Sequence, residues 1–78
     1  MIKYKQIYLD YFGLTTADWI ACTWCKVSAI DFHHGIFKSQ GGKDVIENII
    51  PVCRHCHTHA HSDKEFNNHL INEHLQNL

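Results

Sequence analysis

The stretch from residue 53 to residue 61 reads CRHCHTHAH and places two cysteines and four histidines within nine positions. Its cysteines, Cys53 and Cys56, are separated by two residues, and CTWC repeats this spacing upstream with Cys22 and Cys25. Two intervening residues let both sulfurs of a pair reach one tetrahedral Zn²⁺, so two such pairs complete a site of four thiolates. A redox-active CxxC and two disulfides are the competing interpretations. We predict one structural Zn²⁺ that leaves no coordination position open for chemistry.

The composition of the 78-residue chain favours this zinc site. Hydrophobic residues make up 45% and charged residues 19%, which is typical of a globular domain. A chain this short gains little stability from its core alone, whereas a zinc site can supply about 10–16 kcal/mol of apparent binding energy. No apolar run is long enough to span a membrane, and MIKYKQIY lacks a signal-peptide pattern. We therefore expect a cytoplasmic chain with reduced cysteines.

The pattern of apolar and turn-forming residues predicts an α+β fold in one domain over residues 1–78. Gly13 can end the first helix, Asp44 and Glu47 suggest a capped helical turn, and SDKE at 62–65 fits a capping box. Pro51 keeps its strand at the edge or end of a sheet. The expected elements are a helix over about 2–12, a strand over 27–34, a turn ending near Asn48, a strand over 49–52, a helix from about Arg54 and a C-terminal helix over about 63–77.

The C-terminal helix carries an apolar stripe, which we interpret as core packing. Asn67 interrupts this stripe. Its apolar members are Phe66, Leu70, Ile71, Leu75 and Leu78.

The histidines of the second helix offer two possible ligand pairs. Residues four apart share a helix face, so His57 with His61 and His55 with His59 fit equally well by spacing. Spacing alone does not separate these two pairs.

Upstream, DFHHG ends the first expected strand with His33 and His34 side by side. A reactive metal site built from strand-end and helix residues needs at least three ligands and an open position. His33 and one helix pair would supply three imidazoles, with His34 beside the metal and free to act as a base.

The segment CTWCKVSAIDFHHG…GGKDVIENIIPVCRHCHTHAH, about half the chain, resembles the zinc-stabilised branch of the HNH nuclease superfamily. The matching features are CxxC, a strand ending in His-His, a Gly-Gly loop, Glu-Asn before an apolar strand, and C-x-x-C-H-x-x-x-H. The resemblance implies a small ββα-metal (His-Me finger) core over residues 22–61 with flanking N- and C-terminal helices. In this family the helix ligands directly follow the second CxxC, which selects His57 and His61.

The resemblance also implies a function, a metal-dependent DNA endonuclease with low intrinsic sequence specificity. It assigns His34 as general base in a one-metal mechanism and His33, His57 and His61 as ligands of the catalytic metal. Asn48 would hold the loop backbone and so fix the base. Many relatives carry aspartate at position 33. Three imidazoles suit Zn²⁺, Ni²⁺, Co²⁺ or Mn²⁺ better than Mg²⁺.

DNA is the implied partner, although the net charge of −1 gives no global attraction to nucleic acid. Lys38, Lys43 and Arg54 are candidates for contacts with the DNA backbone. Small free-standing domains of this family often occur in bacteriophages, beside packaging proteins such as terminase, which would place the chain in the host cytoplasm. A non-catalytic zinc module that binds DNA or a protein is the alternative function.

Some residues receive no role from the resemblance. Asp31 is either a partner of a metal ligand or an exposed strand residue, and we favour the exposed residue. A purely structural zinc domain would leave the histidines of the motif unexplained. The histidines without a match, which we expect to be exposed, are His55, His59, His69 and His74.

Overall fold

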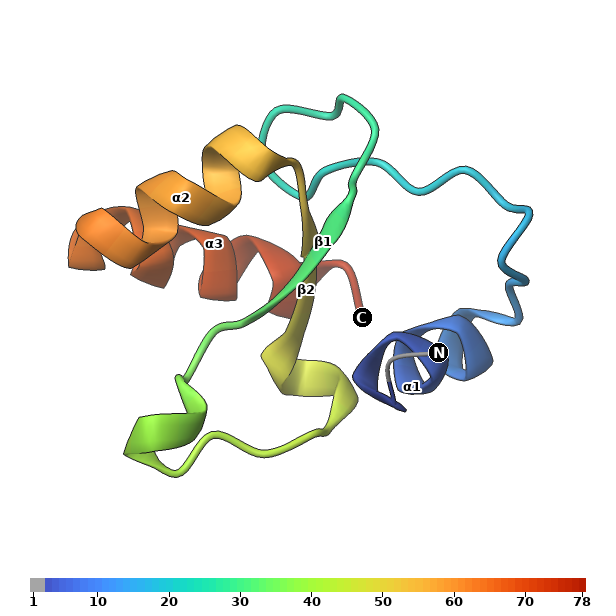
Figure 1. Ribbon diagram of the computed structural model, residues 1–78, viewed down its shortest axis with the longest axis horizontal. Coiled ribbons are helices and arrows are strands. Elements are labelled where there is room, and N and C mark those ends of the chain that lie inside the picture. Colours follow the sequence, from blue (N-terminus) through green and yellow to red (C-terminus); the bar gives the residue numbers. More distant parts are fainter. Residues whose placement is uncertain (1–2) are drawn as a thin grey trace.

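The computed structural model describes residues 3–78, and within them the chain has an α+β fold, as predicted. The expected first residue of the N-terminal helix, residue 2, lies outside the described residues. Residues 3–78 form three α-helices, a two-stranded antiparallel sheet and two 3₁₀ helices (Figure 1). In chain order these are α1 (Lys3–Phe12), β1 (Asp31–His34), η1 (Lys38–Gln40), η2 (Ile46–Asn48), β2 (Ile49–Val52), α2 (Arg54–Ser62) and α3 (Lys64–Gln76).

The sheet lies between α1 on one side and the α2–α3 pair on the other (Figure 1). All four residues of β2 are buried. Ile50 and Val52 belong to the hydrophobic core that α2 and α3 complete. The buried members of this core are Cys22, Ile50, Val52, Cys53, Cys56, Ala60, Phe66 and Leu70. This arrangement is consistent with a ββα-metal core, in which the sheet and α2 carry the motif.

The register of the sheet sends the two adjacent histidines of β1 to opposite sides. His33 pairs with Ile50, and His34 pairs with Ile49. Because side chains alternate along a strand and paired residues share a face, His33 points with Ile50 toward α2. His34 points toward α1, where the Tyr4 ring packs edge-on against it at a centroid distance of 4.7 Å.

The first strand is shorter than predicted, because residues 27–30 are not part of β1. The backbone of this region closes a turn around the first cysteine pair instead. The Cys22 amide donates to the Val27 carbonyl at 2.6 Å, and the Lys26 amide donates to the Cys22 carbonyl at 3.1 Å. Lys26 has a positive φ of 69°, which lets the chain reverse. The strand therefore starts at Asp31, after this turn has ended.

Two helix caps also differ from the prediction. Asp63, not Ser62, caps α3, because its backbone is extended and its carboxylate accepts from the Phe66 amide. Ser62 is the last residue of α2 and donates to the His59 carbonyl. Asp44 does not cap η2, which has no side-chain cap. Its carboxylate instead accepts a hydrogen bond from His34.

The first and last helices each contribute buried apolar side chains to the fold, but the stripe of the last helix is only partly buried. Leu9 of α1 is buried, and Gly13 ends this helix with a φ of 68°. Leu75 of α3 and Leu78, which follows the end of α3, remain 45% and 37% exposed, so the apolar stripe is shorter than its sequence pattern. No helix within residues 3–78 is long and apolar enough to cross a membrane.

Candidate metal centres and active site

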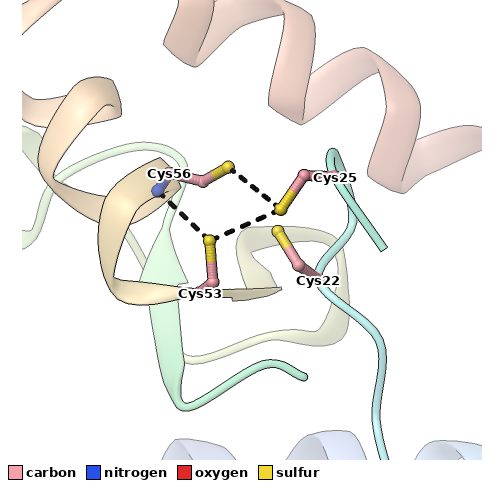
Figure 2. Close-up of side chains that lie close together, drawn as sticks. All are labelled: Cys22, Cys25, Cys53 and Cys56. Carbon is pink, nitrogen blue, oxygen red and sulfur yellow. Dashed lines mark hydrogen bonds between the residues drawn. The ribbon is translucent and has the colours of Figure 1, made fainter. Parts of the chain in front are cut away.

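Four cysteine sulfurs converge where the segment between α1 and β1 meets the start of α2 (Figure 2). They belong to Cys22, Cys25, Cys53 and Cys56. All four lie within 4.8 Å of one another, and Cys25 Sγ is 3.5 Å from Cys53 Sγ and 3.8 Å from Cys56 Sγ. A Zn²⁺ bound at about 2.3 Å to each of four tetrahedral sulfurs separates them by about 3.8 Å. The spacing of the sulfurs therefore fits a structural zinc.

The local backbone already favours negative charge at this cluster. Burial acts to raise the pKa of Cys22, but amide hydrogen bonds from Cys25, Cys53 and Trp24 outweigh it and lower that pKa to about 6. Burial raises the pKa of Cys56. The hydrogen bonds thus favour the thiolate at Cys22, and a bound cation would be needed to hold the buried Cys56 in its charged form.

A second cluster joins β1 to α2 and consists of His33, His57 and His61. The candidate ligand nitrogens of these three side chains lie within 4.8 Å of one another. His57 and His61 occupy one face of α2 a single turn apart, with their Nε2 atoms 3.2 Å from each other. The other pair allowed by spacing, His55 with His59, is not part of this cluster. His59 instead stacks on the Phe66 ring at a centroid distance of 4.0 Å.

The protonation of His33 suits a metal ligand, which must be a neutral imidazole. His33 is 1% exposed. Burial lowers its pKa to about 4, although a hydrogen bond to Asn67 opposes this shift. The imidazole is therefore neutral at pH 7 and has a lone pair to offer.

Asp31 orients His57, so the expectation that Asp31 is an exposed strand residue is wrong. His57 Nδ1 donates to Asp31 Oδ2 at 3.0 Å, and the Arg54 guanidinium clasps the same carboxylate at 2.8 Å and 3.2 Å. This bond leaves His57 Nε2 directed at the cluster, as in the carboxylate–histidine–metal arrangement of many metal sites. The signal was present in the sequence, because residues 31 and 33 share a face of a strand.

His34 lies beside the histidine cluster and has a carboxylate partner of its own. Its Nε2 donates to Asp44 Oδ1 at 2.7 Å, and Lys38 Nζ lies 3.3 Å from the other oxygen. The bond to His34 is the main cause that holds the pKa of Asp44 below its usual range. An ionised Asp44 only accepts, so the neutral form of His34 has its proton on Nε2 and its lone pair on Nδ1.

Asn48 closes the loop that links His34 to β2. It is 7% exposed, and its Oδ1 accepts from the Ile36 amide at 2.6 Å. Its Nδ2 donates to the carbonyl oxygens of Ile36 and Lys43 at 3.0 and 3.1 Å. One side chain thus joins both ends of the loop immediately after the His34 position.

The histidines line a small cavity of about 210 Å³. Aromatic rings form its walls, and the Phe37 ring stacks on His61 at a centroid distance of 4.8 Å. Lys38 supplies a cationic group at the cavity. The lining residues are Tyr4, Phe32, His33, His34, Phe37, Lys38, His57 and His61.

The remaining predicted residues have mixed surroundings. The side chains of Lys38 and Arg54 are 60% and 72% exposed, but each is paired with an aspartate. Lys43 is exposed. The prediction that His74 is exposed is wrong, because this side chain is 2% exposed and its Nε2 donates to the Ile46 carbonyl at 2.7 Å. Burial lowers the pKa of His74.

Comparison with known families identifies the chain. A family model described as HNH endonuclease matches residues 21–63, which is more than half of the chain. Comparisons with curated proteins and with solved structures found no match. The chain belongs to the HNH endonuclease family, and its four clustered cysteines fit the zinc-stabilised branch. Membership indicates a nuclease-type function in binding or cleaving DNA.

Proposed function

We propose that this member of the HNH endonuclease family is a metal-dependent enzyme that hydrolyses DNA phosphodiester bonds with low sequence specificity. The observation that carries the proposal is the convergence of His33, His57 and His61 in one cavity with His34. Three neutral imidazoles can hold a divalent ion, and a fourth histidine with a free ring nitrogen lies at the same cavity. A purely structural zinc domain needs neither feature.

His34 is the general base of the proposed reaction. A phosphodiester hydrolyses slowly in part because water is a weak nucleophile, and an imidazole can accept the proton of water near neutral pH. The Asp44 bond occupies Nε2 and leaves Nδ1 as the accepting atom. After proton transfer the imidazolium is stabilised by the Asp44 carboxylate, as a buried aspartate stabilises the histidine of a catalytic triad.

His33, His57 and His61 would hold the catalytic divalent ion. When bound, such an ion stabilises the negative charge that builds on the phosphate and on the leaving 3′ oxygen. This assignment predicts 5′-phosphate and 3′-hydroxyl ends. The imidazole ligands favour Mn²⁺, Ni²⁺, Co²⁺ or Zn²⁺ over Mg²⁺.

DNA would approach the cavity where exposed basic side chains of the protein can contact its phosphates. Lys38 lines the cavity, which makes it the strongest candidate for a phosphate contact, with Lys43 and Arg54 as weaker candidates. The net charge of −1 provides little general attraction for a polyanion. We therefore propose that a partner helps to hold the DNA, with a phage packaging protein such as terminase as the candidate suggested by the family resemblance.

A plasmid assay tests the function. Supercoiled DNA is incubated with the zinc-loaded protein and Mn²⁺, Mg²⁺, Ni²⁺ or Zn²⁺ in turn, and nicked and linear forms are measured. His34→Ala is compared with His69→Ala, a control that removes an exposed histidine of α3. We expect cleavage by wild type and the control, and none by His34→Ala with its structural zinc retained. Equal behaviour of His34→Ala and wild type in every metal would remove the catalytic role and favour the non-catalytic zinc module.

A further inference from the structure

Asn67 of α3 connects the C-terminal helix to the histidine cluster. Its side chain is a polar interruption in the apolar face of α3 and is only 8% exposed. Asn67 Oδ1 lies 2.7 Å from His33 Nε2, and Asn67 Nδ2 donates to the Gly35 carbonyl at 2.9 Å. Both polar groups of one buried amide thus bind β1 or the residue that follows it.

The helix is tightly docked at this point. A Cβ atom added to Gly35 would lie 2.7 Å from Ile71 Cγ1, closer than packed side chains approach. The close contact between Gly35 and α3 leaves the amide of Asn67 little freedom to move away from His33. Because burying an amide without partners costs free energy, these two bonds also explain how a polar residue is tolerated here.

The hydrogen-bond pattern determines which nitrogen of His33 carries the proton. The Gly35 carbonyl only accepts, so the Nδ2 group of Asn67 must face it, and Oδ1 must face His33. An amide oxygen also only accepts, so His33 Nε2 must donate. A neutral imidazole protonated on Nε2 has its lone pair on Nδ1.

We propose that Asn67 is a positioning residue of the His33, His57 and His61 centre, which fixes the tautomer of His33 so that this ligand binds metal through Nδ1. His57 has the opposite arrangement, because Asp31 occupies its Nδ1 and leaves Nε2 for the metal. The inference rests on the metal centre proposed above. It extends that centre beyond residues 21–63, the part of the chain that the family model covers.

The first test needs no substitution. The ¹⁵N signals of the histidine rings are recorded for protein with zinc in the cysteine site, before and after a second equivalent of Zn²⁺. We expect His33 to be protonated on Nε2 in both states and the second zinc to shift its Nδ1 signal. A His33 protonated on Nδ1, or coordination through Nε2, would overturn the inference.

Substitutions then measure how much Asn67 contributes to metal binding. Asn67→Leu removes both bonds, whereas Asn67→Asp keeps an oxygen that can accept from His33 Nε2. Asn68→Leu is the matched control, because Asn68 is the exposed neighbour on the same helix. Affinity for the second Zn²⁺, measured by calorimetry, should fall about 10–100-fold in Asn67→Leu, the range typical of lost ligand-orienting bonds. Asn67→Asp keeps the acceptor for His33 Nε2 but loses the bond to the Gly35 carbonyl, so its affinity should lie between those of Asn67→Leu and wild type. Asn68→Leu should match wild type.

The outcomes separate this inference from the function on which it rests. If Asn67→Leu binds the second zinc as tightly as Asn68→Leu, Asn67 has no positioning role and the inference fails while the metal centre stands. If His57→Ala leaves binding of the second zinc unchanged, the metal centre itself is wrong and the inference falls with it. If Asn67→Leu does not fold, the ring signals of wild type still decide, because they report the tautomer and the coordinating nitrogen of His33 directly.

Discussion

Replacement of Asn48 by alanine should destabilise the loop that leads away from the base histidine. The side chain makes three hydrogen bonds to backbone groups of Ile36 and Lys43. Each contributes about 1 kcal/mol net, and unpaired partners cost more where water does not reach them. Ile36 is 53% exposed, so water can replace part of the loss. We expect Asn48→Ala to lower the free energy of unfolding by about 2–3 kcal/mol.

Chemical denaturation with the structural zinc bound measures this change, and thermal unfolding should show a midpoint lower by about 10–20 °C for a domain of this size. Asn68→Ala, an exposed asparagine, is the control, with an expected change within about 0.5 kcal/mol. Hydrogen exchange gives the local readout, because the Ile36 amide donates to Asn48 Oδ1 and should exchange faster in the variant.

Asn48→Asp sharpens the test. It keeps an acceptor for the Ile36 amide but places carboxylate oxygens against the carbonyls of Ile36 and Lys43. This variant should therefore recover little of the lost stability. An Asn48→Ala protein as stable as Asn68→Ala, with an unchanged exchange rate at Ile36, would refute the idea that Asn48 holds this loop.

Three further predictions follow from the two candidate metal centres. Cys25→Ser should lose its structural zinc and unfold, since zinc binding contributes about 10–16 kcal/mol to domains that fold with it. The zinc content and the circular dichroism spectrum of the variant measure this result. A folded variant without zinc would contradict it. Without metal at the histidine site, the free energy of unfolding should fall as the pH drops from 6.5 to about 4. In this range His33 binds a proton in the unfolded state but stays neutral in the folded state, which costs about 3 kcal/mol of stability. Denaturation at several pH values within the range in which the cysteine site keeps its zinc should therefore show a weaker dependence on pH in His33→Gln than in wild type. Equal slopes would count against the buried neutral imidazole. Asp31→Ala should lower the affinity for the second Zn²⁺, measured by calorimetry, by about 10–100-fold, because the bond that orients His57 is lost. Asp10→Ala, which removes an exposed carboxylate on α1, is the control and should leave this affinity unchanged. Equal affinities in the two variants would exclude the orienting role of Asp31.

Much of the fold follows from local patterns. The apolar IIPV segment forms β2 over the predicted residues, and the cysteine spacing anticipates a cluster that the structure assembles from two distant segments. The strand prediction failed at residues 27–30, because the Val27 carbonyl and the Ala29 amide bond to Cys22 and Ile20 rather than to β2. Propensity favours a strand there, but the chain reverses after the first cysteine pair and Ser28 forms an isolated antiparallel bridge with Ala21, so β1 begins later.

The sequence by itself determined which side chains could be ligands, because CxxC and i,i+4 spacing are geometric consequences of a local turn and a helix. Only the tertiary structure decided the partners of His33 and His34. Asp44 accepts from His34, and Asn67 bonds to His33 across 34 positions of the chain. These pairs depend on how the loop closes and where α3 docks, which is set by long-range packing. A hydrogen bond of this kind has no sequence period, so no local pattern could have revealed it.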